Sequence, residues 1–227
     1  MKPWLLEILA CPIDKHYPLE VDILKIEDES TSIEHYGIED AMKRDLQAFF
    51  LQPGNEIDEN GDSLNDIINV EEIDGNIFAY DTLVRKPAPL TDYLEKIKES
   101  IDELIPITNH TGEQVGKMLT ENKDLRDQVD SLREKTINLD GKKDEIKNLF
   151  SAITGNLLRL NWFKQHVEIE SGIMFCSKCN RWYPIKETIP QMLPDELRKK
   201  NEDLVFLKEW EELVDDKITR NGEPFHL

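Results

Sequence analysis

The sequence is poor in cysteine and in positive charge. Three Cys among 227 residues are too few, and odd in number, for a disulfide framework. Lys and Arg total 28 against 47 Asp and Glu, a formal net charge of -19. A surface of this sign repels a phosphate backbone, which predicts no direct binding of nucleic acid. The sparse cysteine indicates a reducing, cytoplasmic compartment.

Long apolar runs are also missing. No stretch approaches the roughly 20 residues that a membrane-spanning helix needs. The apolar start of the chain is short and is interrupted by Glu7, so we expect no secretion signal. The sequence therefore predicts no membrane partner.

The common catalytic motifs do not occur. There is no G-x-G-x-x-G, no Walker A motif and no G-x-S-x-G elbow. The acidic run at residues 56–62 is similar to a calcium loop, but Ile67 stands where the bidentate Glu belongs. The many carboxylates lie along polar helix faces and form no acid–base pair. We therefore expect a protein that is not an enzyme.

Both ends of the chain show β-type patterns. Residues 3–9 have helical spacing, with Trp4, Leu5, Ile8 and Leu9 on one face, and residues 17–24 alternate as a half-buried strand does. Strands are predicted again at residues 167–175, with a turn at 171–172, and at residues 182–185. A charged helix is expected at residues 195–217, followed by a frayed tail.

The interval between the ends is mainly helical. A helix is predicted at residues 38–51 and a short strand at 76–83. Three amphipathic helices follow, at about 92–105, 111–139 and 142–160, the longer ones with partial heptad spacing. Short turns between them favour an antiparallel bundle inside one chain. A dimerising coiled coil is the alternative.

The most specific local signal is the pair in Cys176-Ser-Lys-Cys179. Two thiols at this spacing on a tight turn suit Zn²⁺, which takes four ligands tetrahedrally. A second turn, at Cys11, precedes the other predicted strand, and Asp14 or His16 could supply the fourth ligand. The alternative is a ribbon that has lost its metal and keeps buried thiols. A thioredoxin-like motif is less favoured because no βαβ pattern surrounds the pair.

Two runs of the sequence, residues 1–20 and 172–194, resemble the archaeal form of the tRNA-methyltransferase activator subunit, a small zinc-ribbon family. The strongest part is the Cys-x-x-Cys turn, an aromatic strand and a Thr-Ile-Pro-x-x-Leu segment. The resemblance implies a non-catalytic partner, in a heterodimer, of Rossmann-type S-adenosylmethionine-dependent methyltransferases that modify tRNA, rRNA or a release factor. The family also inserts a helical domain between the halves of its ribbon, and the insertion here is longer.

The resemblance also implies a contact surface for the methyltransferase. Edge strands offer unpaired N–H and C=O groups to a partner sheet. The apolar residues beside the second ribbon strand would complete this surface, namely Ile185, Ile189, Pro190, Met192 and Leu193. The alternative is that these residues pack on the N-terminal helix.

We therefore expect an α+β protein with three parts. Residues 1–33 and 167–197 form a zinc-ribbon-like β domain, residues 34–166 form a helical insertion, and residues 198–227 form an acidic helix and tail. The expected function is methyltransferase activation. The alternative is a helical scaffold or coiled-coil dimer with a structural zinc-ribbon clasp.

Overall fold

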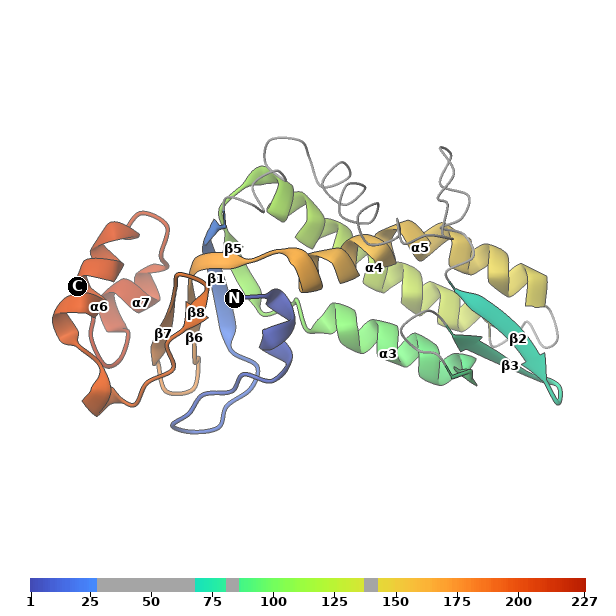
Figure 1. The fold of residues 1–227 in the computed structure, drawn as a ribbon, viewed down its shortest axis with the longest axis horizontal. Helices are drawn as coiled ribbons and strands as arrows, with labels where there is room; N and C mark the ends of the chain where they lie inside the picture. Colours follow the sequence, from blue (N-terminus) through green and yellow to red (C-terminus); the bar gives the residue numbers. More distant parts are fainter. Residues whose placement is uncertain (28–67, 81–85, 137–142) are drawn as a thin grey trace, which may run out of the picture. The chain divides into compact units, whose positions relative to one another are not determined.

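The computed structural model describes residues 1–27, 68–80, 86–136 and 143–227 (Figure 1). The chain divides into two units. The first contains Met1–His35, Glu103–Gly116 and Phe163–Leu227, and the second contains Tyr36–Asp102 and Lys117–Trp162. The predicted helix at residues 38–51, the acidic run at 56–62 and the predicted turn between the second and third helices lie outside the described residues. Within the described part, every helix is too short or too polar to cross a membrane.

The first unit contains a five-stranded sheet in the order β5-β1-β6-β7-β8. Its strands come from both ends of the chain and from one internal segment: β1 (Glu20–Ile26), β5 (Ile107–His110), β6 (Ile169–Phe175), β7 (Trp182–Lys186) and β8 (Ile189–Pro190). β1 pairs antiparallel with β6, and β6 pairs antiparallel with β7. The two ends therefore form one sheet, as the sequence predicted. β5, which pairs parallel with β1, was not predicted.

The turn predicted at residues 171–172 is wrong. Both residues lie inside β6, where Gly172 pairs with Ile23 on one side and Ile185 on the other. A Cβ atom on Gly172 would lie 2.8 Å from the carbonyl oxygen of Asp22. The glycine therefore allows close approach of neighbouring strands and does not mark a turn.

The face predicted for the N-terminal helix is also wrong. This segment is a short 3₁₀ helix, η1 (Pro3–Glu7), that buries Pro3 and Leu6, while Ile8 is 67% exposed. A 3₁₀ helix has three residues per turn, so residues three apart share a face and the α-helical spacing does not apply.

The C-terminal residues cover one face of this sheet. They form η3 (Asp195–Leu197), α6 (Lys200–Glu209) and α7 (Asp216–Asn221), not the continuous helix that was predicted. A buried cluster joins sheet and helices and contains Leu24, Ile173, Phe175, Trp182, Phe206, Leu207, Val214 and Ile218. The predicted frayed tail is wrong as well, because the indole N–H of Trp182 donates to the carbonyl of Phe225 at 2.8 Å.

The second unit combines a small sheet with helices. The strands are β2 (Asn69–Ile73), β3 (Asn76–Tyr80) and β4 (Ala88–Pro89), and the helices are α3 (Leu90–Asp102) and most of α4 (Glu113–Thr136) and α5 (Lys143–His166). Ion pairs join Asp102 to Arg126, Lys98 to Asp130 and Glu95 to Arg133. Residue numbers fall along α3 while those of their partners rise along α4, which confirms that these two helices are antiparallel.

Most apolar side chains at the heptad positions of α4 and α5 are buried within a single copy of the protein. On α4 the buried members are Val115, Met118, Leu125, Val129 and Leu132, and on α5 they are Ile146, Phe150, Ile153 and Leu160. Tyr93 of α3 packs edge-on against Phe150, with ring centroids 5.8 Å apart. These described seam positions are covered within one chain, which favours the bundle over a dimerising coiled coil.

Candidate functional site

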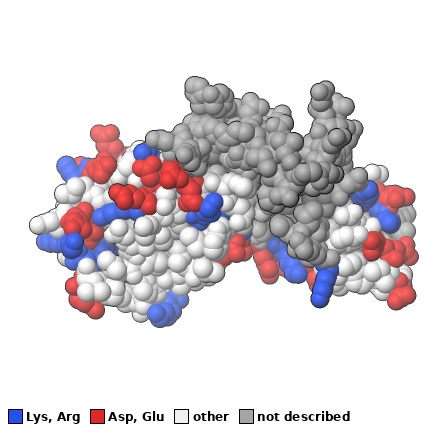
Figure 2. Space-filling view, viewed as in Figure 1, with Lys and Arg blue, Asp and Glu red and all other residues white. Residues whose placement is uncertain are grey.

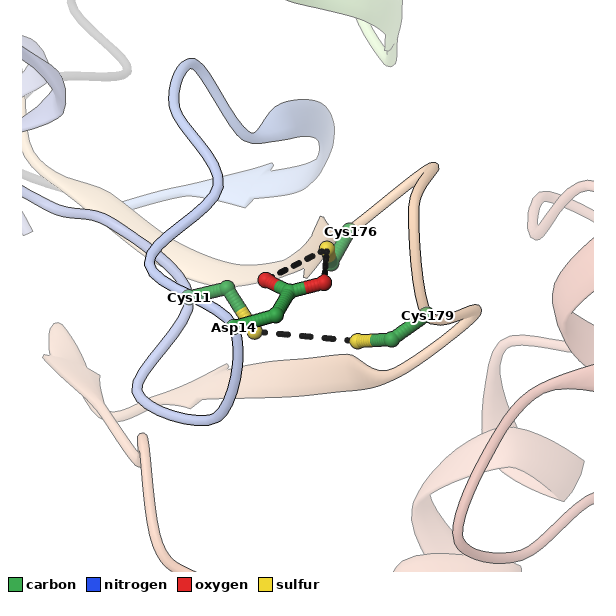
Figure 3. Close-up of side chains that lie close together, drawn as sticks. All are labelled: Cys11, Asp14, Cys176 and Cys179. Carbon is green, nitrogen blue, oxygen red and sulfur yellow. Dashed lines mark hydrogen bonds between the residues drawn. The ribbon is translucent and has the colours of Figure 1, made fainter.

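Four potential metal ligands from the two ends of the chain converge in the first unit (Figure 3). One ligand atom from each of Cys11, Asp14, Cys176 and Cys179 lies within 4.8 Å of all the others. The Sγ atoms of Cys11 and Cys179 are 3.7 Å apart, and Cys176 Sγ lies 3.6 Å from Asp14 Oδ1 and 3.8 Å from Oδ2.

The first turn is closed by its own backbone. The Cys11 N–H donates to the His16 carbonyl, and the Lys15 N–H donates to the Cys11 carbonyl, both at 2.9 Å. The His16 N–H donates to Asp14 Oδ1 at 3.0 Å and so aims this carboxylate. The His16 side chain lies outside the four-residue cluster, with Nε2 3.3 Å from the hydroxyl of Ser177. Of the two fourth-ligand candidates, Asp14 is therefore the one at the cluster.

The second turn connects β6 to β7. The Cys176 N–H donates to the carbonyl of Arg181 at 2.8 Å. Asn180 adopts the left-handed conformation with φ 57°, which a short polar residue tolerates better than most. The Arg181 guanidinium forms a bidentate ion pair with Asp195, with Nη2 donating to Oδ2 at 2.8 Å and Nε to Oδ1 at 3.1 Å. This ion pair ties the turn to the segment that follows β8.

The thiols of the cluster differ electrostatically. Burial opposes ionisation of Cys11, but hydrogen bonds from the Tyr183 hydroxyl and the backbone of Asp14 and Ile13 outweigh it and lower the pKa of Cys11. Burial raises the pKa of Cys176 to about 12. Burial and the neighbouring Cys11 raise the pKa of Tyr183. Cys176 therefore keeps its proton unless a cation stabilises its thiolate.

The donor set fits a zinc ion. With Zn–S bonds of about 2.3 Å, tetrahedral geometry places neighbouring ligand atoms about 3.8 Å apart. The cluster distances from Cys11 to Cys179 and from Cys176 to Asp14 match this spacing. Three thiols and one carboxylate fill all four positions, which is typical of a structural site and leaves no position for a substrate.

An exposed apolar surface lies at the opposite end of the sheet order from β5. Ile189 on β8 is 62% exposed and Leu193 is 42% exposed, while Pro190 and Met192 are partly buried. Ile185 is fully buried, so its prediction as a surface residue is wrong: it lies on β7, an interior strand between β6 and β8. Among the described strands none pairs with the outer edge of β8.

The comparisons with known proteins agree with this geometry. The chain matches the family described as Trm112p-like protein over residues 2–187. It belongs to the Trm112p-like protein family. Searches of curated proteins and of solved structures return no match. Family membership confirms the predicted resemblance and implies a general role as a methyltransferase activator subunit and not as a catalyst.

Sequence reasoning missed several residues around the Trm112p-like site. Tyr183 contacts Cys11 through its hydroxyl at 3.3 Å, and Arg181 orders the second turn through Asp195. The sequence predicted a strand at residues 182–185 but not that Tyr183 would be fully buried beside Cys11. Leu197 and Val205 are also exposed, at 61% and 68%, and lie beyond the family match, as Ile189 and Leu193 do.

Charge on this Trm112p-like chain is mixed. On the face shown in Figure 2, basic side chains lie scattered among acidic ones over the described residues. Several of the basic side chains are held in ion pairs, as Lys199 is by Glu202 and Lys208 is by Glu211. No large basic area of the kind that binds a phosphate backbone is visible on the described part of this face.

Proposed function

We propose that this protein is a non-catalytic subunit that stabilises and activates Rossmann-type, S-adenosylmethionine-dependent methyltransferases acting on tRNA, rRNA or translation factors. The proposal rests on one combination: a Trm112p-like chain exposes Ile189 and Leu193 beside the edge strand β8. The subunit and the enzyme form a heterodimer through this surface.

The physics of the edge supports a protein partner. An edge strand offers backbone N–H and C=O groups that a second sheet can satisfy. Full burial of an Ile or Leu side chain contributes about 1.5–3 kcal/mol relative to exposure. Ile189 and Leu193 together could therefore provide a substantial part of the binding free energy, with Pro190 and Met192 at their side.

Backbone geometry next to β8 is unusual. Glu187 and Thr188 form the two-residue connection between β7 and β8, with φ values of 48° and 65°. A β-branched residue in this region is strained, and such strain concentrates at functional sites. The Thr188 N–H donates to the carbonyl of Glu170 at 3.0 Å, which anchors the turn to β6. Ile189 thus leaves a fixed turn, which supports its role as a preorganised contact residue.

Activation follows from mass action. A partner that binds only the folded enzyme stabilises it by about 4 kcal/mol when present at 1,000 times its dissociation constant. This is a large fraction of the total stability of a typical domain. No chemistry by the subunit is required.

In this proposal zinc has a structural role. Cys11 and Asp14 would bind it from one end of the chain, and Cys176 and Cys179 from the other, in a zinc-ribbon-like β domain. The ion would then hold together turns that are more than 160 residues apart in sequence. The acidic net charge leaves RNA binding to the methyltransferase and favours association with a basic partner.

The test uses the purified full-length chain to capture proteins from a lysate of the source organism. Mass spectrometry should identify Rossmann-type methyltransferases, and the dissociation constant of one of them is then measured. The double substitution Ile189→Asp and Met192→Asp should weaken binding at least 100-fold, because truncated central contacts often cost 2 kcal/mol or more each. Circular dichroism should show that the fold persists.

The matched control is Ile73→Asp in the second unit, an exposed isoleucine (40%) on β2. It should bind the methyltransferase as the unaltered chain does. Equal affinity of the double variant and the control would place the interface elsewhere. If the captured material contains only further copies of this chain, the result would favour the alternative function, a helical scaffold or coiled-coil dimer.

A further inference from the structure

The second metal-binding turn is not closed by its own backbone alone. We propose that the last six residues, 222–227, act as a strap that positions Cys176 and Cys179 for the metal. These residues lie beyond the family match, which ends at residue 187. The inference rests on the zinc site of the proposed function and adds positioning residues to it.

The strap pairs with the turn as a strand would. The Glu223 N–H donates to the carbonyl of Asn180 at 2.8 Å, directly after Cys179 in sequence. The Trp182 N–H donates to the carbonyl of Glu223 at 3.1 Å, so Arg181 and Glu223 form a parallel bridge. Cys176 is part of the same network, because its N–H donates to the carbonyl of Arg181.

The strap is held at both ends. The indole N–H of Trp182 donates to the carbonyl of Phe225, and the Leu227 N–H donates to the carbonyl of Thr219 on α7 at 2.9 Å. Gly222 starts the strap where there is no room for a side chain. A Cβ atom there would lie 2.5 Å from the carbonyl oxygen of Ile218 and 2.8 Å from Cδ1 of Trp182.

The two turns therefore differ in construction. The backbone hydrogen bonds of the Cys11 turn join residues 11–16 to one another. The backbone of the Cys176 turn has one such internal bond, from Cys176 to Arg181, and also pairs with Glu223, more than 40 positions away. Groups that hydrogen-bond around a ligand set its orientation, and altering them typically lowers metal affinity 10- to 100-fold. The strap meets this description through the backbone of Asn180 and Arg181.

The test measures zinc content, zinc release to a chromogenic chelator, and Co²⁺ titration followed by visible absorbance on the unaltered chain and on each folded variant. Gly222→Ala should displace the strap and weaken metal binding about 10-fold or more. Two controls keep the strap: Arg220→Ala removes an exposed ion pair on α7, and Val214→Ala thins the buried cluster under α6 and α7. Both controls should hold metal as the unaltered chain does, although Val214→Ala unfolds more easily.

If Gly222→Ala fails to fold, the second strap variant is a chain shortened to end at Gly222, and its metal binding is measured in the same way. Weakened metal binding in either folded strap variant, with both controls unaffected, supports the strap. Unchanged binding in a folded strap variant overturns it, as does equal weakening by Val214→Ala, which would mean that general stability sets affinity. A zinc content near zero in the unaltered, reduced chain would instead remove the metal site itself, while the proposed methyltransferase surface would stay open to its own test.

Discussion

The two units of the chain differ in what they expose. All but one of the large apolar side chains that are exposed in the described residues belong to the first unit, among them Ile8, Ile189, Leu197 and Val205. The second unit contributes Ile73. Scattered exposed apolar groups are common on proteins, but here nearly all of them belong to the unit that also contains the edge strand β8, which is where we propose that the methyltransferase binds.

The units also differ in how they use charge. In the second unit, ion pairs between α3 and α4 lie at the surface and leave both partners at least a fifth exposed. The first unit has exposed ion pairs as well, such as Arg220 with Asp216, but it also contains two buried cations, Lys164 and Arg198. Buried charges depend on their partners far more than exposed ones do, so the same type of substitution should have unequal effects in the two units.

The largest expected difference concerns two lysines. Lys164, with a side chain 5% exposed, forms ion pairs with Glu7 at 2.7 Å and with Glu103. Burial of the Glu103 carboxyl raises its pKa, and the neighbouring Glu7 raises it further, while Lys164 acts in the opposite direction. Lys164→Met leaves two neighbouring carboxylates without their cation and should lower the free energy of unfolding by about 3 kcal/mol. Denaturant titration followed by circular dichroism measures this loss.

The control is Lys98→Met in the second unit, which removes the surface pair with Asp130. Its cost should stay below about 1 kcal/mol, because exposed pairs are screened by solvent. Equal costs for the two lysine variants would show that the contrast in burial has no energetic consequence.

A smaller effect is expected at Asp22 of β1, which is 5% exposed. Its Oδ1 accepts from the Thr108 hydroxyl at 2.9 Å, while Oδ2 has no partner among the described residues. Burial raises the pKa of Asp22 above its ordinary 3.8, and the charges of Lys217, Asp215 and Glu20 act on it as well. Asp22→Asn should therefore increase the free energy of unfolding at pH 7 by about 1 kcal/mol.

The effect of Asp22→Asn on the free energy of unfolding should depend on pH. With a raised pKa, the folded state binds more protons than the unfolded state, so this carboxyl favours folding below pH 3.8 and less so as pH rises through its folded pKa. The advantage of Asp22→Asn should thus vanish in acid. Asp130→Asn should show the opposite trend, because the hydrogen bond from Lys98 lowers the pKa of Asp130. Parallel pH profiles for the two variants would contradict this assignment.

Much of the helical part could be predicted from the sequence. The spacing of apolar residues such as Leu94, Val129 and Ile153 depends only on nearby sequence. Apolar residues that recur with a period of 3.6 indicate which face of a helix is buried. The structure places α3, α4 and α5 close to the predicted ranges. At the chain ends, alternation at residues 17–24 and 167–175 predicted strands that the sheet contains. The Cys-x-x-Cys pair and the turn at Cys11 predicted one ligand cluster with Asp14 or His16 as its fourth member, and the structure places Asp14 there.

What the sequence could not provide depends on contacts between distant segments. β5 has four residues and too few positions for a periodic signal, and its parallel pairing with β1 is set by tertiary contacts. The burial of Ile185 depends on β7 being an interior strand, paired with β6 on one side and β8 on the other. The strap at residues 222–227 is short and has no periodic pattern, and its hydrogen bonds to Asn180, Trp182 and Thr219 distinguish it from a free tail.

Hydrogen–deuterium exchange of the chain, free and bound to a captured methyltransferase, tests the central claim most directly. We expect slower exchange on binding in residues 184–193, at β8 and its turn, and unchanged exchange in α3 and in the middle of α4. Protection confined to those helices, with residues 184–193 exchanging as in the free chain, would contradict the account.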